Sequence, residues 1–407
     1  VNLTGPSAGK SFLFKIGMYV FTIGSLIASI FTNFNVLMVA RVIQAIGAAA
    51  TLSNSFGLIS QIFPDKNRGR AMGFNTMFIS AGFIAGPALG GLLLQYFYWN
   101  SIFMINIPIG IVAIIMSYFF LPKEKVGKMA KGFDWTGSIL LFVIVAGFIS
   151  YLEIGQNSGF GSPIMLLGIL VIVILAIAFW YWERRHTAPI LDFGLFKNIS
   201  FTISLVAGVM VMIANSFFDI VFPFYLQDIL NWSVGVAGLM MIAFPVVMAI
   251  FAPIGGALGD KVNRNLITIV GAILLILSQL MYTTFGLTTS VWLMLLATTI
   301  NGIGTAFFVS NNTTLIMANV SGEQAGVAGA VQSLLTNLGQ VLGVVFANIS
   351  LYTTMSAKAG HRVNTIPIKH PDWFVDGMHV AFIVTTVLLV IALLIALRRN
   401  AKGFGVK

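Results

Sequence analysis

Cysteine is absent from this chain of 407 residues, and only 8% of the residues are charged. The lack of cysteine excludes disulfide bonds and thiolate metal sites. So little charge excludes an ordinary soluble protein, in which about 25% of residues are charged. Nucleic acid is also excluded as a partner, although the formal net charge is +10, because the basic residues lie between apolar runs and form no single patch.

Sequence patterns of enzymes are missing as well. The chain contains no HExxH zinc motif, no GxSxG nucleophile elbow and no phosphate-binding lysine loop. The segment GALGD at 256–260 resembles one motif of intramembrane aspartyl proteases, but a second aspartate in a matching motif is not present. We therefore predict that the protein is not an enzyme and that it holds neither a cofactor nor a metal ion.

Long apolar runs make up most of the sequence. Hydrophobic residues account for 58% of the chain, and the mean hydropathy is +0.97. A helix that crosses a membrane needs about 20 mostly apolar residues, and this length predicts an all-α polytopic membrane protein. We expect twelve spans, at 11–31, 36–60, 71–95, 101–121, 135–153, 163–182, 200–226, 234–258, 265–286, 290–316, 325–352 and 377–397.

Lysine and arginine are distributed unevenly between the two ends of these spans. One side carries 18 of the 22 basic residues, whereas the other carries only Lys358, Arg362 and Lys369, all in one loop. Because basic residues favour the cytoplasmic side of a membrane, we expect both termini of the chain to be cytoplasmic. The expected location is the plasma membrane, with the lipid bilayer as the surroundings and a monomer as the working unit.

The segment AGFIAGPALGGLL at 81–93 combines regularly spaced glycines with a proline. Gly82, Gly86 and Gly90 are four residues apart and share one helix face, and Gly91 follows directly. Pro87 removes a backbone donor and bends the helix. In a membrane, such glycines allow two helices to approach closely. We therefore predict a kinked helix that packs tightly against a neighbour.

Arg41 lies inside the predicted span 36–60, where a charged side chain is costly unless it faces a cavity or a partner. Gln44 is three residues away, near it on the same helix face. One interpretation is an arginine that snorkels or is paired for structural reasons. The other interpretation, favoured because charge inside a membrane usually serves function, is a functional role. Arg41 and Gln44 are thus candidate functional residues.

Asp219 is the one acid deep within a predicted span, and Asn215 lies four residues earlier on the same face. In apolar surroundings a carboxyl group holds a proton more readily than in water, so Asp219 can exchange protons. Its charged form can also neutralise a cationic ligand. The alternative is a structural aspartate near an outer vestibule, and the sequence leaves these interpretations open.

The sequence PIGGALGDKVNR at 253–264 predicts a short charged turn after the eighth span. Its candidate gating residues are Gly256, Asp260, Lys261 and Arg264. Asp260 is able to cap or pair with the end of another helix, although such turns mostly fix loop geometry. Residues 5–10, GPSAGK, resemble a shortened counterpart, and internal repeats are common in transporters.

Several of these segments resemble motifs of the major facilitator superfamily. VARVIQAIGAAA resembles the arginine motif of the fourth helix, with Ala45 where the motif has glycine. GFIAGPALGG resembles the antiporter motif of the fifth helix, and GGALGDKVNR resembles the second-half copy of the loop motif between helices two and three. WNSIFMINIPIGI, PILDFGLFKN and FPFYLQDILNWSVGVAGL are similar to the fourteen-helix drug:proton antiporter (EmrB/QacA-like) branch.

This resemblance implies a major facilitator fold that lacks its first two helices, since both N-terminal motifs lie two helices early. It implies a partial N-terminal helical bundle at 1–121, a linker with two extra membrane helices at 122–199, and a C-terminal six-helix bundle with a tail at 200–407. It also implies roles for three features: Arg41 in proton coupling, the antiporter motif in helix bending and leak, and Asp260 in gating.

We predict a secondary transporter that exports hydrophobic or cationic drugs in exchange for protons by alternating access. In this prediction, protonation of Asp219, or of an acid in the missing segment, alternates with drug binding, and Arg41 tunes that acid. The partners are then a small hydrophobic substrate and protons. The alternatives are export of a lipid, a peptide or another metabolite, and a non-functional fragment of such a transporter.

Overall fold

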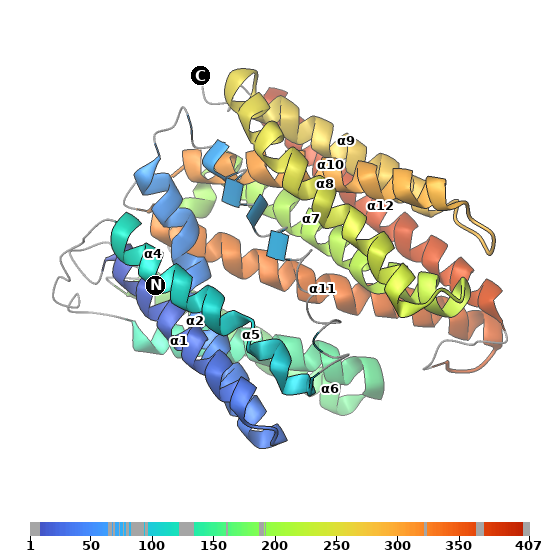
Figure 1. The fold of residues 1–407 in the computed structure, drawn as a ribbon, viewed down its shortest axis with the longest axis horizontal. Coiled ribbons are helices and arrows are strands. Elements are labelled where there is room, and N and C mark those ends of the chain that lie inside the picture. The colour runs from blue at the N-terminus through green and yellow to red at the C-terminus, as the bar shows by residue number, and fades with distance from the viewer. Residues whose placement is uncertain are drawn as a thin grey trace.

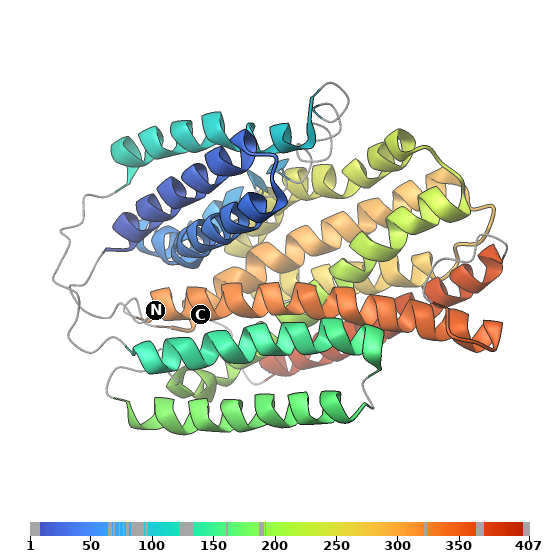
Figure 2. The same ribbon diagram turned by 90° about the horizontal axis from the view of Figure 1, so that it is seen from below.

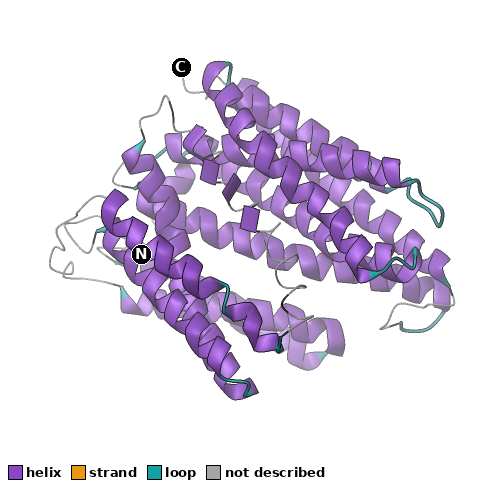
Figure 3. Ribbon diagram, in the orientation of Figure 1, coloured by secondary structure: helices purple, strands orange, loops and turns teal. Residues whose placement is uncertain are grey.

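The computed structural model describes residues 9–63, 67, 70–72, 74–75, 77–78, 81–82, 93, 97–121, 134–159, 162–186, 191, 193–320, 324–363 and 370–401. Within these residues every regular element is a helix and no strand occurs (Figures 1 and 3). Eleven segments of this described part are long and apolar enough to cross a membrane. The predicted all-α polytopic class is therefore confirmed.

The helices follow the predicted spans closely. The first part of the chain forms α1 (Lys10–Ile30), α2 (Phe34–Ile62), the short η1 (Trp99–Phe103), α4 (Asn106–Phe120), α5 (Trp135–Ser158) and α6 (Pro163–Arg185). The second part forms η2 (Phe193–Lys197), α7 (Ile199–Phe224), a π-helical turn η3 (Tyr225–Ile229), α8 (Val234–Lys261), α9 (Arg264–Tyr282), α10 (Val291–Ala318), α11 (Ala325–Ala359) and α12 (Pro371–Ala401). The remaining predicted span, 71–95, falls largely outside the described residues.

Side-chain caps set the starts of several helices. Asn33, Asn198 and Asn263 each accept a hydrogen bond from the backbone N–H two residues later, over 2.8, 3.0 and 2.8 Å. Asp134 accepts one from the backbone N–H of Gly137 over 2.8 Å. These bonds satisfy N–H groups that the first helical turn leaves without a partner.

Three helix ends differ from the prediction, each for a local reason. The segment 253–261 is not a turn but the last part of α8, and Gly255 and Gly259 let it pack directly against α10, where a Cβ would meet Phe307 or Asn311. Helix α11 continues to Ala359 and stops before Gly360, which has a φ of +72°. Helix α12 begins at Pro371, a residue suited to a first turn.

Helices α7–α12 pack around a shared aromatic core. Helix α7 contacts α10, α11 and α12, and α9 contacts α10 and α12 (Figure 1). In the first part of the chain, α1 packs against α2 and α4, and Figure 2 shows α5 and α6 side by side along one edge of the molecule. Helix α11 joins the two parts because it contacts α2 and α5 as well as α7. The core between α7, α9 and α12 is built from Phe218, Phe222, Tyr225, Tyr282, Phe285 and Phe382.

Two glycine crossings hold neighbouring helices at close range. A Cβ on Gly17 of α1 would lie 2.7 Å from the carbonyl oxygen of Gly47 on α2, and one on Gly271 of α9 would lie 2.8 Å from that of Gly304 on α10. Gly82, by contrast, is exposed, and a Cβ there would meet no described atom within 4 Å. The other glycines and the proline of the predicted antiporter motif, Gly86, Pro87, Gly90 and Gly91, lie outside the described residues.

Candidate functional site

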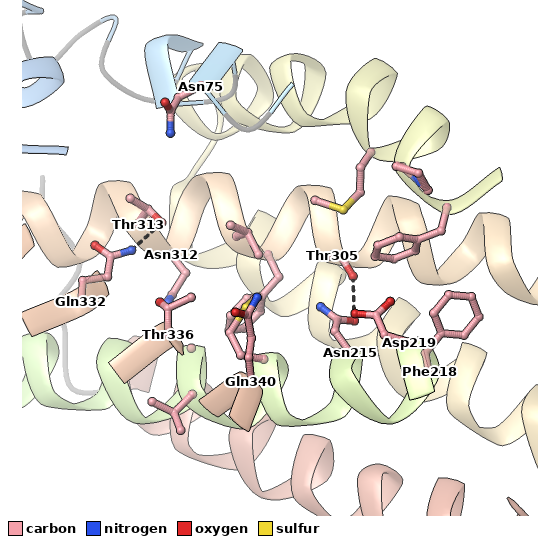
Figure 4. Close-up of a pocket in the computed structure, with 18 of the residues that line it drawn as sticks. Asn75, Asn215, Phe218, Asp219, Thr305, Asn312, Thr313, Gln332, Thr336 and Gln340 are labelled. Carbon is pink, nitrogen blue, oxygen red and sulfur yellow. Dashed lines mark hydrogen bonds between the residues drawn. The ribbon is translucent and has the colours of Figure 1, made fainter. Parts of the chain in front are cut away.

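A cavity of about 350 Å³ lies between α7, α8, α10 and α11 (Figure 4). Met72 and Asn75, from the earlier part of the chain, complete its wall. The cavity is elongated in Figure 4, with Asp219 toward one end and Thr313 and Gln332 toward the other. A site between helices from both parts of the chain is the usual position for a ligand in a helical membrane protein.

The wall of the cavity is apolar with a small set of polar groups. Its soft apolar surface includes Met212, Met241, Met248, Phe218 and Phe244, and methionine and aromatic side chains adapt to ligands of varied shape. Its polar residues are Asn75, Asn215, Asp219, Thr305, Asn312, Thr313, Gln332, Thr336 and Gln340. Asp219 is thus the one ionisable side chain among the described lining residues.

Asp219 lies near the end of α7, one turn before Pro223 and the π-helical turn η3. Its side chain is accessible from the cavity and lies between Asn215 and Phe218 (Figure 4). Asn215 is itself occupied, because its Oδ1 accepts a hydrogen bond from Thr305 over 3.3 Å. No hydrogen bond or ion pair joins the Asp219 carboxyl group to another described side chain, so its charge is available to a proton or a ligand.

Arg41 and Gln44 lie together on α2, away from the Asp219 cavity. The Arg41 guanidinium donates to Gln44 Oε1 over 3.4 Å and lies 4.8 Å from the centre of the Phe103 ring. Gln44 is buried and donates to Ser25 Oγ over 2.8 Å. Arg41 is exposed and is not among the cavity-lining residues. The structure therefore brings Arg41 to Gln44 but does not bring it to Asp219.

Asp260 joins the two parts of the chain at the other end of α8. One carboxylate oxygen pairs with the guanidinium of Arg264 over 3.1 Å. The other oxygen accepts a hydrogen bond from the backbone N–H of Arg70, over 3.0 Å. Gly256 is buried inside α8, and Lys261 is exposed. Asp260 thus touches a helical segment from the earlier part of the chain, 190 residues away in sequence.

An apolar cluster around Met72 shares residues with the wall of the cavity. Met72 packs with buried residues from η2, α7, α10 and α11, so all of these elements meet at one place. The members are Met72, Leu195, Phe201, Leu205, Ile316, Met317, Val327, Ala328 and Val331. Met72, Leu205 and Ile316 also line the cavity.

Sequence reasoning missed the polar stripe on α11. Gln332, Thr336 and Gln340 are spaced by four residues, which places them on one helix face, and all three line the cavity. That spacing was a usable signal in the sequence. Of the asparagines inside the spans, Asn312 lines the cavity, whereas Asn54 and Asn311 donate to backbone carbonyl groups one turn earlier in their helices.

Comparison with protein families gives one matching model, the Major Facilitator Superfamily, over residues 8–196 and 204–403. Among curated proteins, the chain is 32% identical over 342 residues to the riboflavin transporter RibZ of Clostridioides difficile, covering 84% of this chain and 74% of the relative. It is 30% identical to the multidrug resistance protein Stp of Mycobacterium tuberculosis, covering 86% of this chain and 65% of the relative.

Two further proteins extend the comparison. The tetracenomycin C resistance and export protein of Streptomyces glaucescens is 28% identical, covering 85% of this chain and 64% of the relative. Among solved structures, the human organic anion transporter MFSD10 (TETRAN) has a TM-score of 0.67 at 14% identity, covering 96% of this chain and 78% of that one. The last likeness concerns the fold alone. The chain spans between about two thirds and three quarters of the length of these curated relatives.

Proposed function

Because the chain belongs to the Major Facilitator Superfamily, we propose that it exports hydrophobic, cationic compounds in exchange for protons. The observation that carries this proposal is the carboxyl group of Asp219, the one ionisable group among the described residues of a cavity wall rich in methionine and phenylalanine. Transport leaves the substrate chemically unchanged. The proposed setting is the plasma membrane, with both termini cytoplasmic and a monomer as the working unit.

Exchange follows from the position of Asp219. A carboxylate in apolar surroundings is unfavourable unless its negative charge is neutralised, and either a proton or a cationic ligand can neutralise it. The proton and the cationic ligand compete for the same carboxylate oxygen atoms, so binding of the cation releases the proton. Competition of this kind is the requirement for antiport. The soft side chains Met212, Met241 and Phe244 would enclose the apolar body of the ligand.

Alternating access requires that the cavity can open toward each side of the membrane in turn. We infer that opening toward one side is opposed by the contacts of Asp260 with Arg264 and Arg70, and by the apolar cluster around Met72. With the proposed orientation, these contacts lie on the cytoplasmic side. Opening toward the cytoplasm would break the hydrogen bond from Arg70 and separate the cluster, which gives Asp260 its proposed role as a gate.

The experiment is ethidium uptake into liposomes that contain the reconstituted chain, with and without an imposed pH gradient. We expect uptake that depends on the gradient, and a loss of at least about tenfold in Asp219→Asn. The matched control is Asp228→Asn, which removes an exposed acid of η3 that does not line the cavity; it should stay near the wild type. Equal wild-type uptake with and without the gradient would contradict proton coupling.

A second candidate is transport of a neutral, hydrogen-bonding ring compound such as a flavin. The observation that favours it is the uncharged polar stripe of Gln332, Thr336 and Gln340, and a riboflavin transporter is among the relatives. The same liposomes separate the two candidates. If this second function held, the wild-type liposomes would take up riboflavin and not ethidium, and Asp219→Asn would leave riboflavin uptake intact, because a neutral flavin has no charge to pair with Asp219.

A further inference from the structure

The end of the cavity opposite Asp219 contains two buried amide side chains, Asn312 of α10 and Gln332 of α11 (Figure 4). Both line the cavity, and their exposed fractions are only 3% and 8%. Each retains one oxygen atom, Asn312 Oδ1 and Gln332 Oε1, for which the described part of the chain provides no hydrogen-bond partner. Because native proteins rarely leave a buried acceptor unpaired, two such atoms in the wall of one cavity point to a ligand that supplies the missing donors.

The amide of Asn312 is held in one orientation by α7. Its Nδ2 donates to the backbone carbonyl of Ser204 over 2.9 Å, and a carbonyl oxygen can only accept. Gly208, one turn further along α7, leaves room for this contact, since a Cβ there would lie 3.2 Å from Asn312 Nδ2. The nitrogen end of the amide is therefore engaged by the protein, and the oxygen end is left for a ligand.

The amide of Gln332 is held in a similar way by α10. Its Nε2 donates to Thr313 Oγ1 over 2.8 Å, a contact that Figure 4 marks with a dashed line. Thr313 follows Asn312 directly in the sequence, so α10 supplies one of the two amides and positions the other. In both amides the donor end is bound to the protein and the acceptor end is not.

A row of polar side chains connects these two amides with Asp219. Beyond Gln332, Thr336 and Gln340 follow on the same face of α11, and Figure 4 shows them in a row that leads toward Asn215 and Asp219. A compound whose positive charge lies at Asp219 can therefore extend along polar groups to the amides. The two ends of the cavity differ in chemistry, because one offers a negative charge and the other offers uncharged acceptors.

Hydrogen-bond donors are the ligand groups that suit the amide end. An N–H or O–H group of a bound compound can donate to an amide oxygen, whereas an ether, a carbonyl group or a carboxylate has no hydrogen to offer. A metal ion is not served by this end, because hard cations take about six oxygen ligands and the two amides provide one oxygen each. The chemistry therefore selects amino, amide and hydroxyl groups.

We propose that Asn312 and Gln332 form a second subsite of the cavity, which selects cationic compounds that carry an amino, amide or hydroxyl group away from the charged centre. This inference rests on the proposed function, in which Asp219 holds the positive charge of the compound. A site that is built to hydrogen-bond its ligand binds an analogue without the donor less well, because the acceptors then stay unpaired. Asn312 and Gln332 are thus specificity-determining residues.

The test compares two permanent cations in equilibrium binding to the purified chain in detergent, measured by calorimetry at one pH. Ethidium carries two amino groups on its ring system, whereas tetraphenylphosphonium carries no N–H or O–H group. Gln332→Met keeps the length of the side chain but removes the acceptor. We expect the affinity for ethidium to weaken about fivefold, the effect of one hydrogen bond, and the affinity for tetraphenylphosphonium to stay unchanged or become tighter.

Asn312→Leu is the second variant and should have the same selective effect. The matched control is Asn337→Leu, which removes an exposed amide of α11 that does not line the cavity and donates to the Ser333 carbonyl over 2.8 Å. It should bind both cations as the wild type does. Binding of tetraphenylphosphonium also shows that a variant is folded, and if Asn312→Leu does not fold, Gln332→Met decides alone.

Two results would overturn the second subsite. One is an unchanged affinity for ethidium in Gln332→Met, as expected if a permanent internal water fills this end of the cavity. The other is an equal weakening for both cations, which would make the amide a structural group. Asp219→Asn is a separate arm of the experiment. If this variant bound both cations as tightly as the wild type, the proposed function would be contradicted, while the selectivity of Gln332→Met would still decide the subsite.

Discussion

The helix pairs α1–α2 and α9–α10 are built on the same plan in the two parts of the chain. Each pair crosses at two facing glycines, Gly17 with Gly47 and Gly271 with Gly304. On α2, Gln44 and Arg41 lie three and six residues before Gly47. On α10, Asn301 and Thr298 lie three and six residues before Gly304. Six residues after that glycine, both helices continue with Ser-Asn, at 53–54 and 310–311.

The hydrogen bonds of the two pairs also correspond. The Gln44 amide donates to Ser25 Oγ over 2.8 Å, and the Asn301 amide oxygen accepts from Ser278 Oγ over 3.2 Å, so both pairs join an amide to a serine with donor and acceptor reversed. Further along, Asn54 donates to the carbonyl group four residues earlier over 2.8 Å, and Asn311 does the same over 2.9 Å. The glycine crossing and the amide–serine pair therefore form a shared scaffold.

The two pairs differ at the position six residues before the glycine. Arg41 on α2 is charged and exposed, whereas Thr298 on α10 has an exposed fraction of 0%. Because the two helix pairs share the rest of this arrangement, we expect the residue at this one position to have a different role in each part of the chain. Arg41 presents a charge at an accessible face, and Thr298 closes a buried polar site next to Tyr282.

Exchanging the residues at this position gives the largest expected effect. Thr298→Arg puts a charge into a site without exposed surface, and an uncompensated buried charge costs about 3–5 kcal/mol. We expect little folded protein, or a strongly lowered unfolding temperature in detergent. The reciprocal change, Arg41→Thr, removes an exposed side chain and should leave the unfolding temperature nearly unchanged. Equal stability of the two variants would show that the two sites do not differ as described.

The glycine crossings are expected to be equally intolerant in both parts. A Cβ on Gly47 would clash with the backbone nitrogen of Phe21, and one on Gly271 would lie 2.6 Å from that of Phe308. Since backbone atoms cannot rotate away, Gly47→Ala and Gly271→Ala must push the helices apart, at a cost of about 1–3 kcal/mol. Gly235→Ala is the control, because a Cβ there meets nothing within 4 Å. Destabilisation in only one of the two pairs would break the comparison.

The sequence predicted the spans well because an apolar run of membrane length is a strong one-dimensional signal. It also identified Asp219, since an acid within such a run stands out. It did not predict that 253–261 would extend α8, because the glycines there are tolerated only through the contact with α10. Nor did it show that Arg41 and Asp219 lie apart, because spacing gives a position along one helix but not the neighbours of that helix. The cavity wall, made by four helices together with Met72 and Asn75, depends on those neighbours.

Transport should depend on Arg41 even though the fold does not. In Arg41→Thr we expect uptake driven by the pH gradient to fall about tenfold, equivalent to 1.4 kcal/mol, while the protein stays folded. The proposed reason is that Arg41 holds Gln44 and Phe103 in a charged contact on the face of α2. Arg41→Lys is the control that keeps the charge. Full activity of Arg41→Thr would remove this residue from the proposed coupling.

The smallest expected effect separates the two amide–serine pairs. Ser25→Ala leaves the buried amide of Gln44 without its partner, at a cost of about 1 kcal/mol. Ser278→Ala removes a weaker contact, because the Ser278 hydroxyl reaches Asn301 Oδ1 only over 3.2 Å and also donates to the Leu275 carbonyl over 2.7 Å. Ser278→Ala should therefore cost clearly less than Ser25→Ala when both are measured by denaturant unfolding in the same detergent. If Ser278→Ala cost as much as Ser25→Ala, the two serine contacts would contribute equally, and the α9–α10 pair would be a plain copy of the α1–α2 scaffold at this position.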